Sequence, residues 1–137
     1  MKLLSLFAAL GIFAGTVLAA DAPKIAPKDA AKLVAAGKAV LVDCREAEEW
    51  AETGVAAPAV LLPKSDLDGD GKQWKAFLAK NEGKQVLIYC ASGFRANAVA
   101  AELNEQGLRA ANVGGFKGWA AASLPTRKID APKPAGK

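Results

Sequence analysis

The sequence contains no histidine among its 137 residues. This absence excludes hydrolases whose cysteine or serine is activated by histidine, and it removes a ligand that the usual zinc sites require. The chain also lacks the glycine-rich fingerprint of dinucleotide-binding domains, the P-loop motif and any internal repeat. We therefore expect no cofactor and no metal in the chemistry of this protein.

Cysteine is scarce as well, with two residues in the chain, and Cys90 follows a short apolar run at residues 86–89. A continuous run of β-forming residues indicates a strand that is buried on both faces, as in a parallel sheet. From Ala96 onward the pattern is helical, and Gly107 is suited to a left-handed C-terminal cap. Cys90 is thus expected at the carboxyl end of a central strand, in a tight loop that faces a helix N-terminus.

This placement favours a reactive sulfur at Cys90. Free backbone N–H groups and the macrodipole at a helix N-terminus stabilise a negative charge. Gly93 permits the positive φ that lets the loop curl around an anion, and Arg95 adds a permanent positive charge. We expect an electropositive, partly exposed pocket in which the pKa of Cys90 is lowered. The alternative is an inert buried cysteine, which a free cysteine on a strand often is.

The spacing between Cys90 and Arg95 bears on the size of the substrate. Four residues separate the two, whereas the loop of a cysteine phosphatase is one residue longer and surrounds a tetrahedral phosphate. The shorter loop can surround a smaller group, such as one additional sulfur bound to the cysteine. A small cysteine phosphatase or arsenate reductase is therefore disfavoured.

Three stretches resemble the rhodanese (sulfurtransferase) family, in the family's order. Residues 90–95, Cys-Ala-Ser-Gly-Phe-Arg, are similar to its six-residue active-site loop. Residues 41–50 resemble its first strand and acidic turn, and residues 114–119, followed by Pro125, resemble its closing segment. The match covers about residues 25–126. One departure lies at residues 54–59, where the family's common histidine is absent, which affects local packing but not the nucleophile.

The resemblance implies a two-step sulfur transfer through a persulfide on Cys90. The thiolate attacks the outer sulfur of a small anionic donor such as thiosulfate, and a thiophilic acceptor, cyanide or a thiol, then takes that sulfur. Arg95 attracts the donor and stabilises charge at the sulfur. The alternative is a sulfur-carrier or interaction module with little small-molecule turnover. The loop that binds the substrate comprises Ala91, Ser92, Gly93, Phe94 and Arg95.

The alternation of predicted strands and helices indicates a three-layer α/β domain with a mainly parallel sheet. Strands are predicted at residues 39–42, 60–62, 86–89 and 110–113, and helices at 26–36, 73–80 and from 96 to Gly107. The resemblance implies a rhodanese-like domain over residues 20–126, for which we expect a five-stranded sheet flanked by helices. Asp43 and Arg45, after the first strand, resemble family residues that brace the active loop.

Cys44 requires a separate interpretation, because the resemblance makes its strand a neighbour of the strand that ends at Cys90. Its sulfur could then bridge to Cys90, either as a structural disulfide or as a resolving thiol, which makes Cys44 a candidate redox partner. The favoured alternative is that Cys44 is a small buried residue whose side chain is turned away from Cys90.

The two ends of the sequence differ from its centre. Residues 1–19 carry one lysine and a nearly uninterrupted apolar run, which predicts a cleaved secretory signal peptide, a periplasmic location and no stable membrane anchoring after processing. Residues 127–137 are rich in basic residues and proline and are expected to form a disordered basic tail. Between them acidic and basic residues balance, so no nucleic-acid binding is expected of the folded surface.

Two acidic stretches are interpreted as solvent-facing. The four glutamates between residues 46 and 52 are expected on a solvated face of a turn or short helix. Residues 66–71 match the first half of a calcium-binding loop, but the final ligand position is Phe77, so a polar turn is favoured over a weak calcium site. The apolar side of the helix at 73–80, with Trp74, is interpreted as core.

Overall fold

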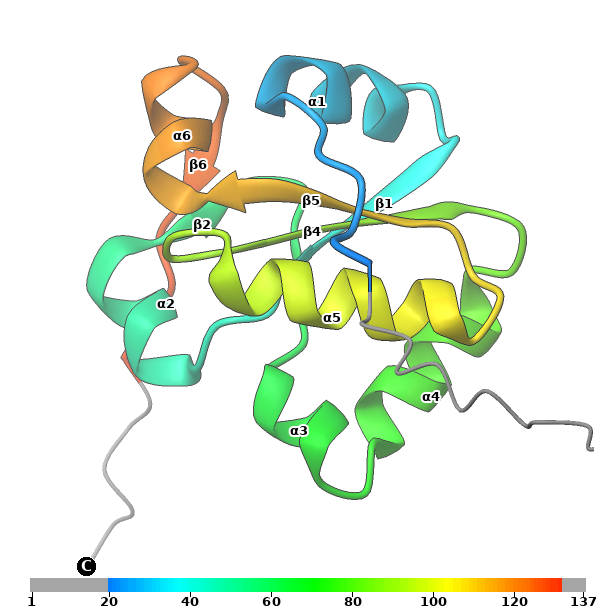
Figure 1. Ribbon diagram of the computed structural model, residues 1–137. Helices are drawn as coiled ribbons and strands as arrows, with labels where there is room; N and C mark the ends of the chain where they lie inside the picture. The colour runs from blue at the N-terminus through cyan, green and yellow to red at the C-terminus, as the bar shows by residue number, and fades with distance from the viewer. Residues whose placement is uncertain (1–19, 132–137) are drawn as a thin grey trace, which may run out of the picture.

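The structure is a computed structural model, and it describes residues 20–131. The predicted signal peptide and residues 132–137 of the predicted tail lie outside the described residues. Within the described part of the chain, no helix is both long and apolar enough to cross a membrane. The described chain has the predicted three-layer α/β arrangement, with helices on both faces of a parallel sheet (Figure 1).

The central sheet has four parallel strands in the order β3-β1-β4-β5. The strands are β1 (Ala39–Asp43), β3 (Val60–Leu61), β4 (Gln85–Cys90) and β5 (Ala110–Gly115), each close to a predicted position. The expected five-stranded sheet is wrong for the described residues. At the outer edge of β5 there is a single parallel bridge between Lys24 and Asn112. The segment does not extend into a strand, because Pro23 has no N–H to donate and Pro27 already begins a helix.

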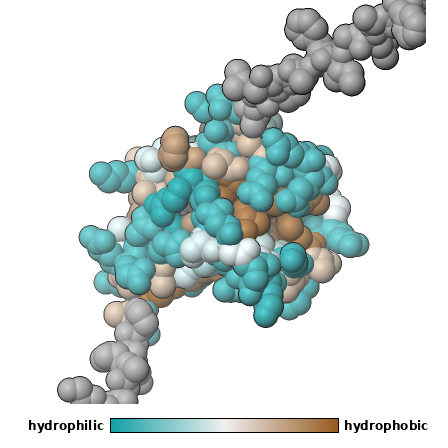
Figure 2. All heavy atoms as spheres, turned by 60° about the horizontal axis from the view of Figure 1, so that its bottom comes forward, coloured by the Kyte–Doolittle hydropathy of each residue, from teal (hydrophilic) through white to brown (hydrophobic). Residues whose placement is uncertain are grey.

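Helices cover both faces of the sheet, as Figure 1 shows. One face carries α1 (Pro27–Ala35) and α6 (Phe116–Ala121), and the other carries α3 (Lys64–Asp68), α4 (Lys72–Lys80) and α5 (Phe94–Glu105). Side chains alternate between the two faces along each strand. Val42 and Ile88 belong to the core cluster on the α4–α5 side, whereas Leu41 and Leu87 belong to the cluster on the α1–α6 side. The outer surface below α3 and α4 is largely hydrophilic, with apolar residues visible toward its middle (Figure 2).

Helix α4 confirms the predicted aromatic core. Trp74 and Phe77 are buried, and their rings pack edge to face with centroids 6.2 Å apart.

The preceding acidic stretch differs from the favoured prediction of a polar turn, because residues 64–68 form helix α3. The carboxylate of Asp66 accepts backbone N–H bonds from Gln73 (3.1 Å) and Trp74 (3.2 Å). Asp66 thus satisfies free donors at the N-terminus of α4.

A small second sheet closes the domain beside the carboxyl ends of the central strands. Strand β2 (Val55–Ala56) pairs antiparallel with β6 (Thr126–Arg127). The Arg127 side chain also donates to the carbonyl oxygens of Ala57 (3.1 Å) and Ala59 (2.9 Å). The prediction that the disordered tail begins at residue 127 is therefore wrong, because backbone pairing and these side-chain bonds hold Arg127 in the fold. Helix α2 (Ala47–Thr53) precedes this sheet.

Candidate active site

The predicted strand, loop and helix around Cys90 are all present. Cys90 is the last residue of β4, and α5 begins at Phe94. Gly93 is the N-cap of α5 and has φ +93°, in the left-handed region that favours glycine. A Cβ atom added to Gly93 would also lie only 3.3 Å from the Cα of Gly114. The tight loop therefore depends on glycine at this position.

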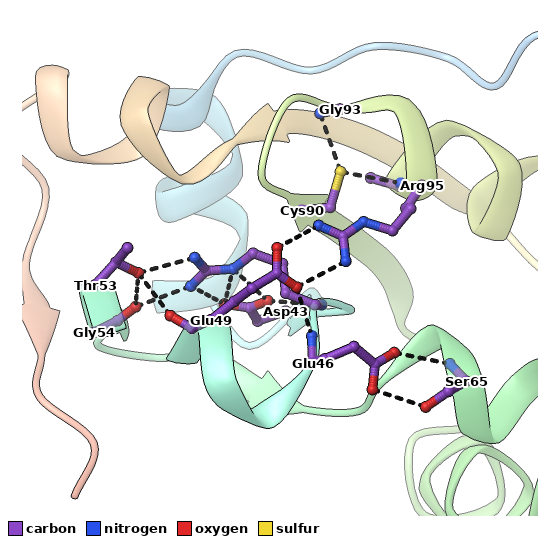
Figure 3. Close-up of polar contacts among 11 residues, drawn as sticks. Asp43, Glu46, Glu49, Thr53, Gly54, Ser65, Cys90, Gly93 and Arg95 are labelled. Carbon is purple, nitrogen blue, oxygen red and sulfur yellow. Dashed lines mark hydrogen bonds and ion pairs between the residues drawn. The ribbon is translucent and has the colours of Figure 1, made fainter. Parts of the chain in front are cut away.

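Backbone amides of the loop and helix surround the Cys90 sulfur (Figure 3). The Gly93 N–H donates to Sγ at 3.0 Å and the Ala96 N–H at 3.4 Å. The pKa of Cys90 is lowered to about 5, chiefly by a side-chain hydrogen bond from Cys44, then by the loop and helix amides, against the opposing effect of burial. This shift favours the thiolate form of Cys90 near neutral pH. The expectation of a partly exposed pocket is wrong, because only 1% of Cys90 is exposed.

Cys44 lies beside Cys90, and the favoured prediction that its side chain is turned away is wrong. The register pairs Val42 with Ile88 and Asp43 with Tyr89, so Cys44 and Cys90 are the next residues along their strands. Both belong to the core cluster on the α4–α5 side. The hydrogen bond to Cys90 and burial raise the pKa of the Cys44 thiol. Both cysteines are free in the structure.

Asn112, on β5, ties the loop to the sheet and was not predicted. Its side-chain amide donates to the Gly93 carbonyl at 3.0 Å, and its carbonyl oxygen accepts the N–H of Gly114 at 2.9 Å. Asn112 is buried, and its bond to Gly93 is shielded from water, whereas the bond from Gly114 is partly buried. The only sign of this role in the sequence was that Asn112 is a polar residue within a strand predicted to be buried.

At Gly115 the backbone of β5 lies very close to the backbone of the active loop at Ala91. Replacing Gly115 by alanine tests whether the site depends on this contact. An added Cβ would meet the Ala91 carbonyl oxygen, 2.3 Å away, so the loop would have to shift. We expect Gly115→Ala to cost about 1–3 kcal/mol of stability and to lower the sulfur transfer predicted from the sequence by at least about tenfold, because the loop amides no longer point at the Cys90 sulfur. Thermal unfolding and a thiocyanate assay measure the two effects.

Gly118→Ala is the matched control. Its Cβ would come no closer than 4.0 Å, to the Pro27 side chain, and alanine is favoured over glycine inside a helix by roughly 0.5–1 kcal/mol. We expect this variant to retain its stability and activity. Equal losses in Gly115→Ala and Gly118→Ala would show that the contact with Ala91 is not the cause.

Arg95 pairs with Glu49 rather than approaching the sulfur. Its two terminal nitrogens contact the two carboxylate oxygens of Glu49 at 2.8 and 2.7 Å (Figure 3). This bidentate pairing lowers the pKa of Glu49 to about 2. The predicted solvated face of α2 is therefore wrong at Glu49. At Glu46 the carboxylate accepts the hydroxyl of Ser65 at 2.8 Å in a solvent-exposed bond, which agrees with the predicted solvated position.

The buried ion pair of Asp43 and Arg45 stabilises the C-terminal end of α2. The guanidinium bonds both carboxylate oxygens of Asp43, and it also donates to Thr53 Oγ1 and the Gly54 carbonyl, each at 2.9 Å. It lies 4.9 Å from the centre of the Phe116 ring. Arg45 thus positions the C-terminal end of α2, the helix that carries Glu49. Because Glu49 pairs with Arg95, Arg45 also influences the position of Arg95 in the active loop.

The remaining predicted loop residues are on the surface. Ala91 and Ser92 are exposed, and Phe94 is 84% exposed. The Ser92 hydroxyl makes no hydrogen bond to another described residue. The loop therefore contributes backbone amides toward the sulfur and points its larger side chains outward.

The family model for the rhodanese-like domain matches residues 26–122. The chain belongs to the rhodanese-like family. A search of curated proteins finds no match. Among solved structures, a rhodanese-like domain protein from Staphylococcus aureus is 27% identical, with a TM-score of 0.61 over 77% of this chain and 99% of that one. This similarity confirms the predicted fold class.

Two further structures are similar to this rhodanese-like domain. A polysulfide-sulfur transferase homodimer from Wolinella succinogenes is 25% identical, with a TM-score of 0.62 over 80% of each chain. A Rhodopseudomonas palustris protein of unknown function, described as a possible tyrosine phosphatase, is 27% identical, with a TM-score of 0.65 over 77% of this chain and 85% of that one. The family and the first of these proteins support sulfur transfer in general.

Proposed function

We propose that this rhodanese-like domain is a sulfurtransferase that carries a sulfane sulfur as a persulfide on Cys90. The observation that carries the proposal is the buried Cys90 sulfur, which accepts N–H bonds from Gly93 and Ala96 and has its pKa lowered to about 5. A thiolate that is already formed needs no general base, which is consistent with a chain that contains no histidine.

The first half-reaction is a displacement at sulfur. The Cys90 thiolate attacks the outer sulfur of thiosulfate, a new S–S bond forms, and the original S–S bond of thiosulfate breaks. Sulfite leaves with the electron pair of that bond. The persulfide keeps the negative charge, which the loop amides and the N-terminus of α5 stabilise.

The second half-reaction returns the enzyme to its thiolate. A thiophilic acceptor such as cyanide attacks the outer sulfur of the persulfide, and the Cys90 sulfur leaves with the bonding electrons. Thiocyanate is the product. Arg95 attracts the anionic donor toward the loop, although its pairing with Glu49 partly neutralises its charge.

Phe94 favours a second candidate function, in which the persulfide is delivered to a protein thiol and small molecules turn over slowly. Its side chain is 84% exposed, two residues beyond the exposed Ser92 and next to the loop glycine. A large exposed aromatic side chain beside a reactive sulfur suits contact with a protein acceptor. A tyrosine phosphatase function is not proposed, because the loop between Cys90 and Arg95 is one residue too short.

The test uses the purified, freshly reduced protein. It is incubated with thiosulfate, its intact mass is recorded, and peptide mapping locates any added sulfur. Thiocyanate formation is then measured after cyanide is added. A gain of one sulfur atom on the Cys90 peptide with continuous thiocyanate formation supports the enzyme, and a gain without turnover supports the carrier. Neither a mass gain nor thiocyanate would overturn sulfur transfer from this donor.

A further inference from the structure

Cys44 and Cys90 are arranged for reaction with each other. They follow the paired residues Asp43 and Tyr89 on adjacent parallel strands and point to the same face of the sheet. The Cys44 backbone is held on both sides, because its N–H donates to Tyr89 O at 3.1 Å and its carbonyl accepts the Lys64 N–H at 3.0 Å. Adjacent strands are about 4.8 Å apart, within the roughly 4.4–6.8 Å Cα separation that a disulfide spans.

The two sulfurs differ in their surroundings, although both residues are buried. Cys44 is fully buried in the core cluster that contains Trp74 and Leu62. Cys90 is contacted from the other side by the loop amides of Gly93 and Ala96. Among the buried residues of that core cluster, Cys90 is the one other nucleophilic side chain, so a reaction of the Cys44 thiol within the cluster involves the Cys90 sulfur. The sulfurtransferase mechanism proposed above does not use Cys44 as a nucleophile.

We propose that Cys44 resolves the Cys90 persulfide and thereby releases its outer sulfur as sulfide. This inference rests on the proposed function, because a persulfide must first form on Cys90. The Cys44 sulfur attacks Sγ of Cys90, a Cys44–Cys90 disulfide forms, and the bond from Cys90 to the outer sulfur breaks. The outer sulfur leaves with the bonding electrons and takes the proton of the Cys44 thiol, so hydrosulfide is the product.

An external dithiol completes the cycle. It reduces the Cys44–Cys90 disulfide through a mixed disulfide at Cys90, which lies nearer the loop, and is itself oxidised to a disulfide. Over the cycle the sulfane sulfur gains two electrons and the dithiol loses two. The Cys44 thiol loses its proton as it attacks, because the thiolate is the nucleophile, and the departing outer sulfur gains one, so the overall proton count is unchanged. The substrates are thus a sulfane-sulfur donor and a dithiol, and the product is sulfide.

The test is a single turnover without any thiol reductant, because a free dithiol can itself take sulfur from a persulfide. Reduced protein is freed of reductant and loaded with thiosulfate, and sulfide, intact mass and disulfide-linked peptides are followed over time. We expect up to one sulfide per chain, a final mass two hydrogens below that of the reduced protein, and a Cys44–Cys90 crosslink. The rate should not depend on protein concentration, because both groups belong to one chain.

Cys44→Ser is the discriminating variant. It keeps Cys90, the loop amides and, in the serine hydroxyl, a donor for the hydrogen bond that lowers the pKa of Cys90, so we expect it to gain one sulfur from thiosulfate but to release sulfide at least tenfold more slowly than the wild type. Cys44→Ala is used if the serine variant does not fold. It also removes the donor to the Cys90 sulfur, so we expect it to gain sulfur more slowly, and its sulfide release is followed after loading is complete. The crosslink in the wild type needs no variant.

Two results would overturn the inference while leaving sulfur transfer intact. One is equal sulfide release by the wild type and Cys44→Ser, and the other is release whose rate rises in proportion to protein concentration, which would indicate attack by a second chain. Failure of both proteins to gain sulfur is a different outcome, because it removes the proposed function and the inference together.

Discussion

Replacing Cys90 by serine is expected to abolish sulfur uptake from thiosulfate and to lower thiocyanate formation by roughly a thousandfold or more. The cysteine is a thiolate near neutral pH because its pKa is about 5, whereas a serine hydroxyl stays neutral and is a poor nucleophile toward sulfur. The fold should be retained, since the hydroxyl can accept the N–H groups of Gly93 and Ala96 that now reach Sγ. Intact-mass measurement and the thiocyanate assay give the result.

The matched control for this variant is Cys44→Ser, which makes the same chemical change one strand away. It leaves the Cys90 sulfur in its loop and places a hydroxyl where the Cys44 thiol donates to that sulfur, so sulfur uptake should persist. Uptake by Cys90→Ser together with loss of uptake in Cys44→Ser would assign the nucleophile to Cys44 and contradict the proposed mechanism. Loss in both variants would call for a check of folding by circular dichroism before either residue is assigned.

The elements around Cys90 were predictable because their signals are local. An apolar run of β-formers, a glycine that tolerates positive φ and a helical pattern lie within one continuous stretch, and the structure places β4, Gly93 and α5 accordingly. The individual strands were also found near their predicted positions. The expected fifth strand came from the family resemblance, and in this chain Pro23 and Pro27 leave space for only one bridge at Lys24.

The contacts that tune the site were not predictable, because they join residues far apart in the sequence. The Glu49–Arg95 pair spans 46 positions, and the bond from Asn112 to Gly93 spans 19. A run of glutamates looks solvated in any sequence, and only the placement of α2 over the loop shows that Glu49 has a partner. Whether Cys44 faces Cys90 depends on strand register, since a shift of one residue reverses the face of every side chain.

The register also explains why the buried ion pair and Cys44 are neighbours in sequence but lie on different faces of the sheet. Asp43 and Cys44 point to opposite sides of β1. Asp43 therefore holds Arg45 on the side of Phe116 and Tyr89, whereas Cys44 contacts Cys90 on the other. One short segment thus supplies both the brace for α2 and the thiol beside the nucleophile.

Replacing Arg45 by methionine is expected to be the most destabilising of these changes, at about 3–5 kcal/mol. Arg45 and Asp43 are 2% and 0% exposed, so the variant leaves a buried carboxylate without its partner. It also leaves the Gly54 carbonyl without the guanidinium that donates to it. Since a domain of this kind is stable by roughly 5–15 kcal/mol, thermal or urea unfolding should show a large shift.

Lys64→Met is the matched control, because it breaks an ion pair of similar geometry at the surface. Lys64 and Asp68 are 2.6 Å apart, with side chains 26% and 54% exposed, and such pairs contribute about 0–1 kcal/mol. The double variant Arg45→Met/Asp43→Asn removes the unpaired charge and should recover part of the stability lost in Arg45→Met. If the double variant is no more stable than Arg45→Met, the cost comes from the lost bonds to Thr53 and Gly54, and the buried charge is not its cause.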